Sequence, residues 1–109
     1  MDELIKKVND FRDERDWRQF HNEKDLAISI SLEASELLEL FQWSSSNETI
    51  QKKQAGLEDE LADVLIYSIM LASNLKLDIE EIINNKLKKN EIKYPVKKSK
   101  GNKSKYTDL

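Results

Sequence analysis

Apolar residues recur at intervals of three and four along most of the chain, the spacing that places them on one face of an α-helix. The pattern starts with Leu4, Ile5, Val8 and Phe11 and continues almost to Pro95. Helices are expected over about residues 2–16, 24–43 and 50–75, and from 78 to just before Pro95. With 2 Gly and 1 Pro in 109 residues, the chain lacks the turns of a β-sandwich or barrel. The predicted fold class is therefore all-α, as a four-helix protomer.

Several residues mark the expected ends of these helices. Small polar side chains at residues 44–47 compete with helical backbone bonding and predict a loop. Gly56 weakens the first turns of the third helix by up to ~1 kcal/mol. Asp78, with Glu81 three residues on, has the spacing of a helix-capping box. The fourth helix should stop before Pro95, because the residue before a proline avoids the helical conformation.

The chain is expected to form one all-α domain over residues 1–94 and an extended or disordered basic tail over 95–109. The third helix is apolar on nearly every side from Leu61 to Leu75, and such a helix must be covered all round. Four short helices can hardly cover it in a monomer. We therefore expect the central helices to assemble into a homodimer or a dimer of dimers.

Charge is distributed unevenly along the chain. Residues 93–109 hold six Lys and one Asp, whereas the rest carries 12 basic and 20 acidic groups. An acidic body is unlike a dedicated nucleic-acid binder, so no stable nucleic-acid partner is expected. The absence of Cys excludes a thiolate metal site and agrees with a reducing compartment. Without a membrane-length apolar run or a signal-peptide pattern, a cytoplasmic location is expected.

The most informative feature is the position of the acidic residues. In the second helix Glu33 and Glu36 are one turn apart, and Glu33 points the same way as Leu26 and Leu37, on the apolar face. An ordinary amphipathic helix would place these acids opposite its leucines. Trp43 lies two turns after Glu36 on the same strip, where an aromatic face can stack on a base.

The third helix repeats this arrangement with Glu60 and Asp63, and Tyr67 follows one turn later. Carboxylates near a core need a partner, because desolvating each costs several kcal/mol. Protonation, a basic side chain or a divalent cation could compensate the negative charge of these carboxylates, and the apolar faces of the two helices contain no Lys or Arg. Oxygen ligands without His or Cys favour Mg²⁺ or Mn²⁺, which shares its ligand shell with phosphates. The four acids therefore predict metal-assisted phosphate chemistry.

The sequence also resembles a known family. The stretches that carry the resemblance are Glu33-Ala-Ser-Glu36, Leu40-Phe41-Gln42-Trp43, Glu60-Leu-Ala-Asp63-Val-Leu-Ile-Tyr67, Arg15-Asp16-Trp17-Arg18-Gln19-Phe20-His21, Lys93-Tyr94-Pro95 and Lys105-Tyr106-Thr107-Asp108-Leu109. They are similar to the all-α nucleoside triphosphate pyrophosphohydrolases of the MazG-like superfamily, and most similar to its dCTP pyrophosphatase branch. The resemblance covers nearly the whole chain. Val8 and Ser35 depart from the family pattern, and the departure at Val8 bears on base selectivity more than on catalysis.

The resemblance implies Mg²⁺-dependent cleavage of a (deoxy)nucleoside triphosphate, dCTP or a modified pyrimidine, to its monophosphate and pyrophosphate. It places the metal ligands on Glu33, Glu36, Glu60 and Asp63. The contacts to base and sugar fall on Trp17, Arg18, Gln19, Phe20, His21, Trp43 and Tyr67. Family members of this branch are four-helix protomers in dimers or tetramers, which agrees with the apolar third helix.

Two points stay open on the sequence. The first is the catalytic base that takes a proton from the attacking water, for which Glu36 and Glu39 are both candidates. The second is whether that water attacks the α- or the β-phosphorus. Two other functions compete with the enzyme. One is a non-catalytic helical module whose acids bind a cation for structure only, and the other is a nucleic-acid-associated factor that uses the lysine-rich tail.

Overall fold

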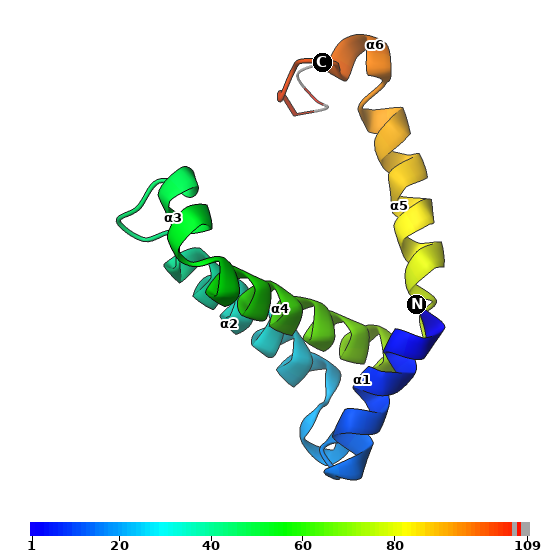
Figure 1. Ribbon diagram of the computed structural model, residues 1–109. Helices are drawn as coiled ribbons and strands as arrows, with labels where there is room; N and C mark the ends of the chain where they lie inside the picture. Colours follow the sequence, from blue (N-terminus) through cyan, green and yellow to red (C-terminus); the bar gives the residue numbers. More distant parts are fainter. Residues whose placement is uncertain (106, 108–109) are drawn as a thin grey trace. The chain divides into compact units, whose positions relative to one another are not determined.

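The computed structural model describes residues 1–105 and 107, and every regular element in them is helical (Figure 1). The elements are α1 (Asp2–Glu14), a short 3-10 helix η1 (Arg18–Phe20), α2 (Glu23–Glu39), α3 (Ser46–Lys52), α4 (Gln54–Asn74), α5 (Ile79–Lys93) and α6 (Val96–Ser99). The all-α prediction is confirmed. The described part of the chain has six α-helices where four were predicted.

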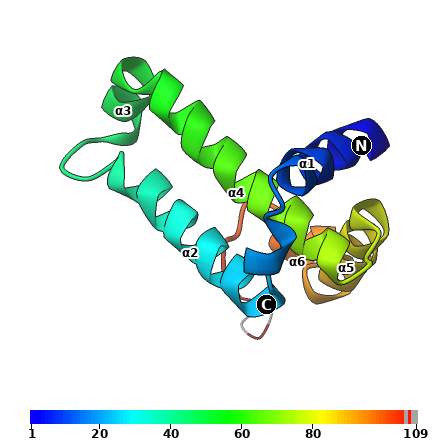
Figure 2. The ribbon, with the colours of Figure 1, turned by 90° about the horizontal axis from the view of Figure 1, so that it is seen from below.

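The chain forms two compact units, Met1–Lys76 and Leu77–Leu109. The first holds α1 to α4, and its centre is the pair α2 and α4, which lie side by side and run in opposite directions (Figures 1 and 2). Helix α1 packs against α4. The buried apolar residues come from these three helices and are Val8, Leu26, Ile69, Met70 and Ala72. This core is small, and it lies toward the end of α4 that meets α1.

The predicted continuous helix over residues 50–75 is wrong at Lys53, where the backbone leaves the helical conformation (φ −126°, ψ 31°). Helix α3 starts inside the predicted loop, because the Ser45 side chain accepts a hydrogen bond from the Glu48 N–H. Thr49 of α3 is 1% exposed, and its hydroxyl donates a 3.0 Å hydrogen bond to the Ser45 carbonyl oxygen. Helix α4 then begins afresh beyond Lys53.

The second unit contains α5 and α6. The Asp78 side chain accepts a hydrogen bond from the Glu81 N–H, so the predicted cap of α5 is confirmed. The tail expected to be extended or disordered holds the short helix α6 directly after Pro95. The fixed φ of a proline suits the start of a helix, which explains this departure. In the part of the chain that the structure describes, none of the helices combines the length and apolar character needed to cross a membrane.

Leu26 is the most deeply buried apolar residue, at 1% exposure. Replacing it by alanine should lower the free energy of unfolding by about 2–5 kcal/mol, since the small core around α2 and α4 cannot close over the missing side chain. Urea denaturation measures the change. Lys24→Ala, on an exposed site of the same helix, should change the stability by less than about 0.5 kcal/mol. Equal effects of both variants would contradict this description of the core.

Candidate active site

Three carboxylates meet where α2 packs along α4. One carboxylate oxygen from each of Glu33, Glu36 and Glu60 lies within 4.8 Å of the other two. Glu33 and Glu36 share a face of α2 because they are one turn apart, and Glu60 approaches from α4. The structure thus brings together three of the four acids predicted as metal ligands. We call these three residues the acid cluster.

The acid cluster is electrostatically unfavourable by itself. An oxygen of Glu33 and an oxygen of Glu60 are buried, and neither has a hydrogen-bond partner among the described residues. Burial, followed by the closeness of the Glu36 and Glu60 carboxylates, raises the pKa of Glu33 to about 7. The pKa of Glu60 is raised by burial and by Glu36. A proton or a cation must therefore compensate the negative charge of the cluster at neutral pH.

The acid cluster fits a divalent cation. Its donors are carboxylate oxygens from two helices, and the two buried oxygens without partners are free to coordinate. Hard oxygen donors are the ligands that Mg²⁺ and Mn²⁺ prefer. Asp63, the fourth predicted ligand, lies outside this group of close oxygens, although its charge contributes to the raised pKa of Glu33 and of Glu60.

Beside the acid cluster is a cavity of about 410 Å³ with mostly apolar walls. It is lined by Lys7, Val8, Phe11, Trp17, His21, Asp63, Ile66, Tyr67 and Met70. Its aromatic rings form an edge-to-face series, with centroids 5.6 Å apart for Phe11 and Trp17, 6.2 Å for Trp17 and His21, and 6.4 Å for His21 and Tyr67. We call it the aromatic cavity. Its volume and walls suit a flat heterocycle.

The aromatic cavity gathers three of the seven residues predicted to bind substrate, which are Trp17, His21 and Tyr67. Sequence reasoning missed Phe11, because its helical spacing with Val8 indicated an ordinary core position. Phe11 is 45% exposed instead, with the Arg15 guanidinium 3.9 Å from its ring centroid.

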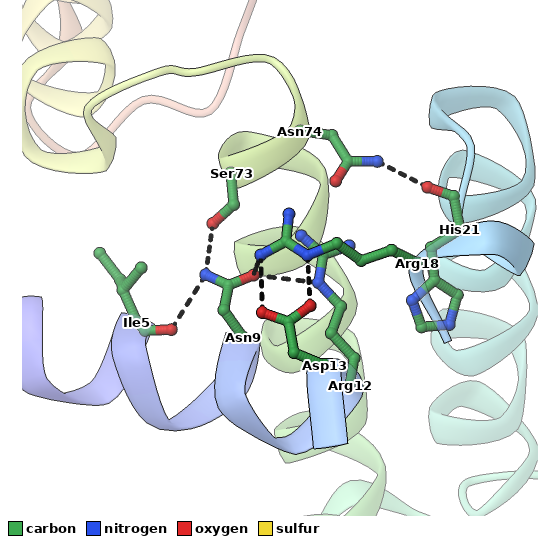
Figure 3. A network of polar contacts seen from close by, with 8 residues as sticks. All are labelled: Ile5, Asn9, Arg12, Asp13, Arg18, His21, Ser73 and Asn74. Atoms are coloured by element: carbon green, nitrogen blue, oxygen red, sulfur yellow. Dashed lines mark hydrogen bonds and ion pairs between the residues drawn. The ribbon is translucent and has the colours of Figure 1, made fainter. Parts of the chain in front are cut away.

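A polar network holds the segment that carries Trp17 and His21 (Figure 3). The chain reverses at Asp16, which has a positive φ of 52°. Arg18 then forms an ion pair with Asp13 of α1. The Asn74 side chain, at the end of α4, donates a hydrogen bond of 2.6 Å to the His21 carbonyl oxygen. Helices α1 and α4 therefore both anchor this wall of the aromatic cavity.

Arg12 lies in the same network and is completely buried. Its Nε donates to Asn9 Oδ1 at 3.0 Å, and its two terminal nitrogens have no partner among the described residues. Burial lowers the pKa of His21, and the positive charge of Arg12 lowers it further. His21 therefore presents a neutral imidazole to the aromatic cavity at neutral pH.

Three residues of the same segment that were predicted to contact the substrate do not line the aromatic cavity. Arg18 forms the ion pair with Asp13, and the Gln19 side chain donates a 2.9 Å hydrogen bond to the Asp16 carbonyl oxygen. Phe20 is 64% exposed and does not line the aromatic cavity.

Trp43 is separated from Trp17 and lines a second cavity of about 580 Å³. The other residues of this cavity are Glu36, Glu39, Leu40, Gln42, Lys53 and Glu60. Trp43 is 95% exposed, and its φ of 63° is a conformation that bulky side chains rarely adopt. Helix α2, expected to continue to Trp43, ends at Glu39 and is followed by this strained turn.

Comparison with known proteins gives consistent matches. The sequence profile of the MazG-like family matches residues 28–109. The dCTP pyrophosphatase 1 of Mus musculus is 42% identical, over 92% of this chain and 62% of the relative. The Homo sapiens protein of the same name is 36% identical over the same shares. The chain thus spans 62% of the length of these curated relatives.

A solved structure agrees with these matches. The crystal structure of a pyrophosphatase from Archaeoglobus fulgidus has a TM-score of 0.83 and 43% sequence identity, over 87% of this chain and 92% of that one. The profile match extends over most of the chain and includes all three residues of the acid cluster. The chain belongs to the MazG-like family.

Proposed function

We propose that this chain is a nucleoside triphosphate pyrophosphohydrolase that acts on dCTP or a related pyrimidine deoxynucleotide and releases the monophosphate and pyrophosphate. The observation that carries the proposal is the acid cluster directly beside an aromatic cavity. The curated relatives are named for dCTP pyrophosphatase activity, and the solved neighbour is named as a pyrophosphatase.

The base of the nucleotide would occupy the aromatic cavity, between Trp17, His21 and Tyr67. Stacking of a base on an aromatic ring contributes about 1–3 kcal/mol. Since His21 is neutral, one of its ring nitrogens can donate and the other can accept a hydrogen bond. Asp63 lines this cavity and follows Glu60 of the acid cluster by one turn of α4, so the sugar and phosphates would leave the cavity on that side.

Glu33, Glu36 and Glu60, with Asp63 beside them, would hold Mg²⁺. When bound, the ion would neutralise phosphate charge and make a coordinated water more acidic. In the proposed reaction the oxygen of a water would form a bond to phosphorus, the bridging P–O bond opposite it would break, and pyrophosphate and monophosphate would separate. Glu36 and Glu39 line the second cavity and are the candidates to accept the proton of that water. Oxygen-labelled water identifies the atom attacked, since label enters the monophosphate for the α-phosphorus and pyrophosphate for the β-phosphorus.

We also propose that this chain assembles into a homo-oligomer. The first unit buries few apolar residues, whereas Leu32, Leu38, Leu61 and Leu65 of α2 and α4 are each at least 50% exposed. A second copy of these helices would cover such side chains. Sedimentation equilibrium should therefore give at least twice the 12.8 kDa mass of one chain. A monomer at micromolar concentration would contradict the predicted assembly.

Turnover should depend on the acid cluster. With Mg²⁺ and a panel of nucleoside triphosphates, the protein should release pyrophosphate, and Glu60→Gln should lower kcat by at least about 100-fold, because metal-assisted stabilisation amounts to several kcal/mol. Glu58→Gln is the matched control, since Glu58 is an exposed acid of the same helix bonded to Gln54. Metal-dependent melting without any turnover would favour a non-catalytic metal-binding module instead.

Stability should depend jointly on pH and metal. The pKa of Glu33 is about 7 in the folded, metal-free chain and near 4.5 when unfolded, so the folded state holds the proton more tightly. The free energy of unfolding without metal should therefore fall as the pH rises through this interval. Mg²⁺ requires ionised carboxylates, so it should raise the melting temperature more at about pH 8 than at about pH 5.5.

Thermal denaturation in EDTA and in Mg²⁺ measures this difference. Glu33→Gln removes one of the two carboxyl groups with a raised pKa and should weaken the pH dependence of the metal-free protein. Equal stabilisation by Mg²⁺ at both pH values would argue against a metal bound by the acid cluster.

A further inference from the structure

The acid cluster lies between two cavities of different character. The second cavity includes Lys53, just before α4, and Glu60 of α4, whereas the residues of α4 that line the aromatic cavity run from Asp63 to Met70. Glu36 and Glu60 belong both to the acid cluster and to the second cavity, so this cavity opens directly from the cluster. A molecule whose base filled the aromatic cavity would extend past the cluster into the second cavity.

Lys53 is the single cationic residue in the lining of the second cavity, whose other charged members are acids. Its ammonium nitrogen lies 3.5 Å from the Leu40 carbonyl oxygen, at the end of α2. No carboxylate of the described residues forms an ion pair with it. The ammonium group therefore has donors left for an anionic ligand.

The fold fixes the position of Lys53. It occupies the break between α3 and α4, and its backbone N–H donates a 2.8 Å hydrogen bond to the carbonyl oxygen of the buried Thr49. Lys53 precedes Glu60 by seven residues, which is about 10 Å along a helix axis. A lysine side chain and a pair of linked phosphates can bridge that length together.

We propose that Lys53 binds the terminal phosphates of the substrate and retains them as pyrophosphate after cleavage. This inference rests on the proposed function and extends it to the leaving group. The acids and their cation would engage the phosphates at the point of cleavage, and Lys53 would offset the charge of the phosphates beyond that point. The role is the same whether water attacks the α- or the β-phosphorus, because the two terminal phosphates leave together in both cases.

Product inhibition tests this role. In the full chain with Mg²⁺, Lys53→Gln should weaken inhibition by pyrophosphate about tenfold or more, the usual effect of losing a charge-assisted hydrogen bond. Inhibition by the nucleoside monophosphate should not change. Lys53→Arg keeps the positive charge and should restore most of the pyrophosphate affinity. Lys52→Gln, at an exposed neighbouring site outside the cavity, is the control and should behave like the wild type.

The possible outcomes separate this inference from the proposed function. If the wild type hydrolyses triphosphates and Lys53→Gln retains its pyrophosphate affinity, the inference is wrong and the function stands. An equal loss of affinity for both products would also overturn it, since the effect would not be specific to pyrophosphate. If the wild type hydrolyses nothing, the proposed function fails. Calorimetric titration of Mg²⁺ and pyrophosphate into wild type and Lys53→Gln then decides whether Lys53 binds the anion.

Discussion

Electrostatic repulsion within the acid cluster is the constraint on which the rest of this structure depends. Two closely packed helices direct three carboxylates at one another, and two of the carboxylate oxygens are shielded from water. Such a group persists only with a compensating positive charge, because burial disfavours ionised carboxylates and their neighbours repel them. The start of α4 packs against the residue that follows α2, since a side-chain carbon added at Gly56 would lie in van der Waals contact with the Leu40 side chain, at 3.4 Å.

The two cavities next to the acid cluster differ in chemical character, and in the proposed function each would bind a different part of the nucleotide. Apolar and aromatic side chains from α1, α4 and the segment between α1 and α2 build the cavity on one side. Polar and charged side chains from the end of α2 and the start of α4 line the other. A nucleoside triphosphate has the same polarity, since a flat base lies at one end and the charge lies at the other. The order of the two cavities along α4 thus matches the order of base and phosphates in the proposed substrate.

The all-α fold and the position of the acids in α2 could be predicted from the sequence. Glu33 and Glu36 lie among leucines at helical spacing, and their relative position depends on one helix only. The break at Lys53 could not be predicted, because the helical spacing of apolar residues carries no signal for it, and the nearby Thr49 is buried with its hydroxyl bonded to Ser44, a residue outside its own helix. The separation of Trp43 from the aromatic cavity has a similar origin. It follows from the left-handed turn after α2, and the sequence pattern predicted helix there instead.

The backbone conformation and the exposure of Trp43 determine which residue would be most stable at this position. Its backbone conformation costs a bulky residue of order 1 kcal/mol or more, and a side chain that is 95% exposed recovers almost nothing by burial. Selection for the stability of the isolated chain alone would place glycine at this position. Tryptophan is therefore not the residue that most stabilises the isolated chain at this position, and the most thermostable sequence for this fold should differ from the present one at residue 43.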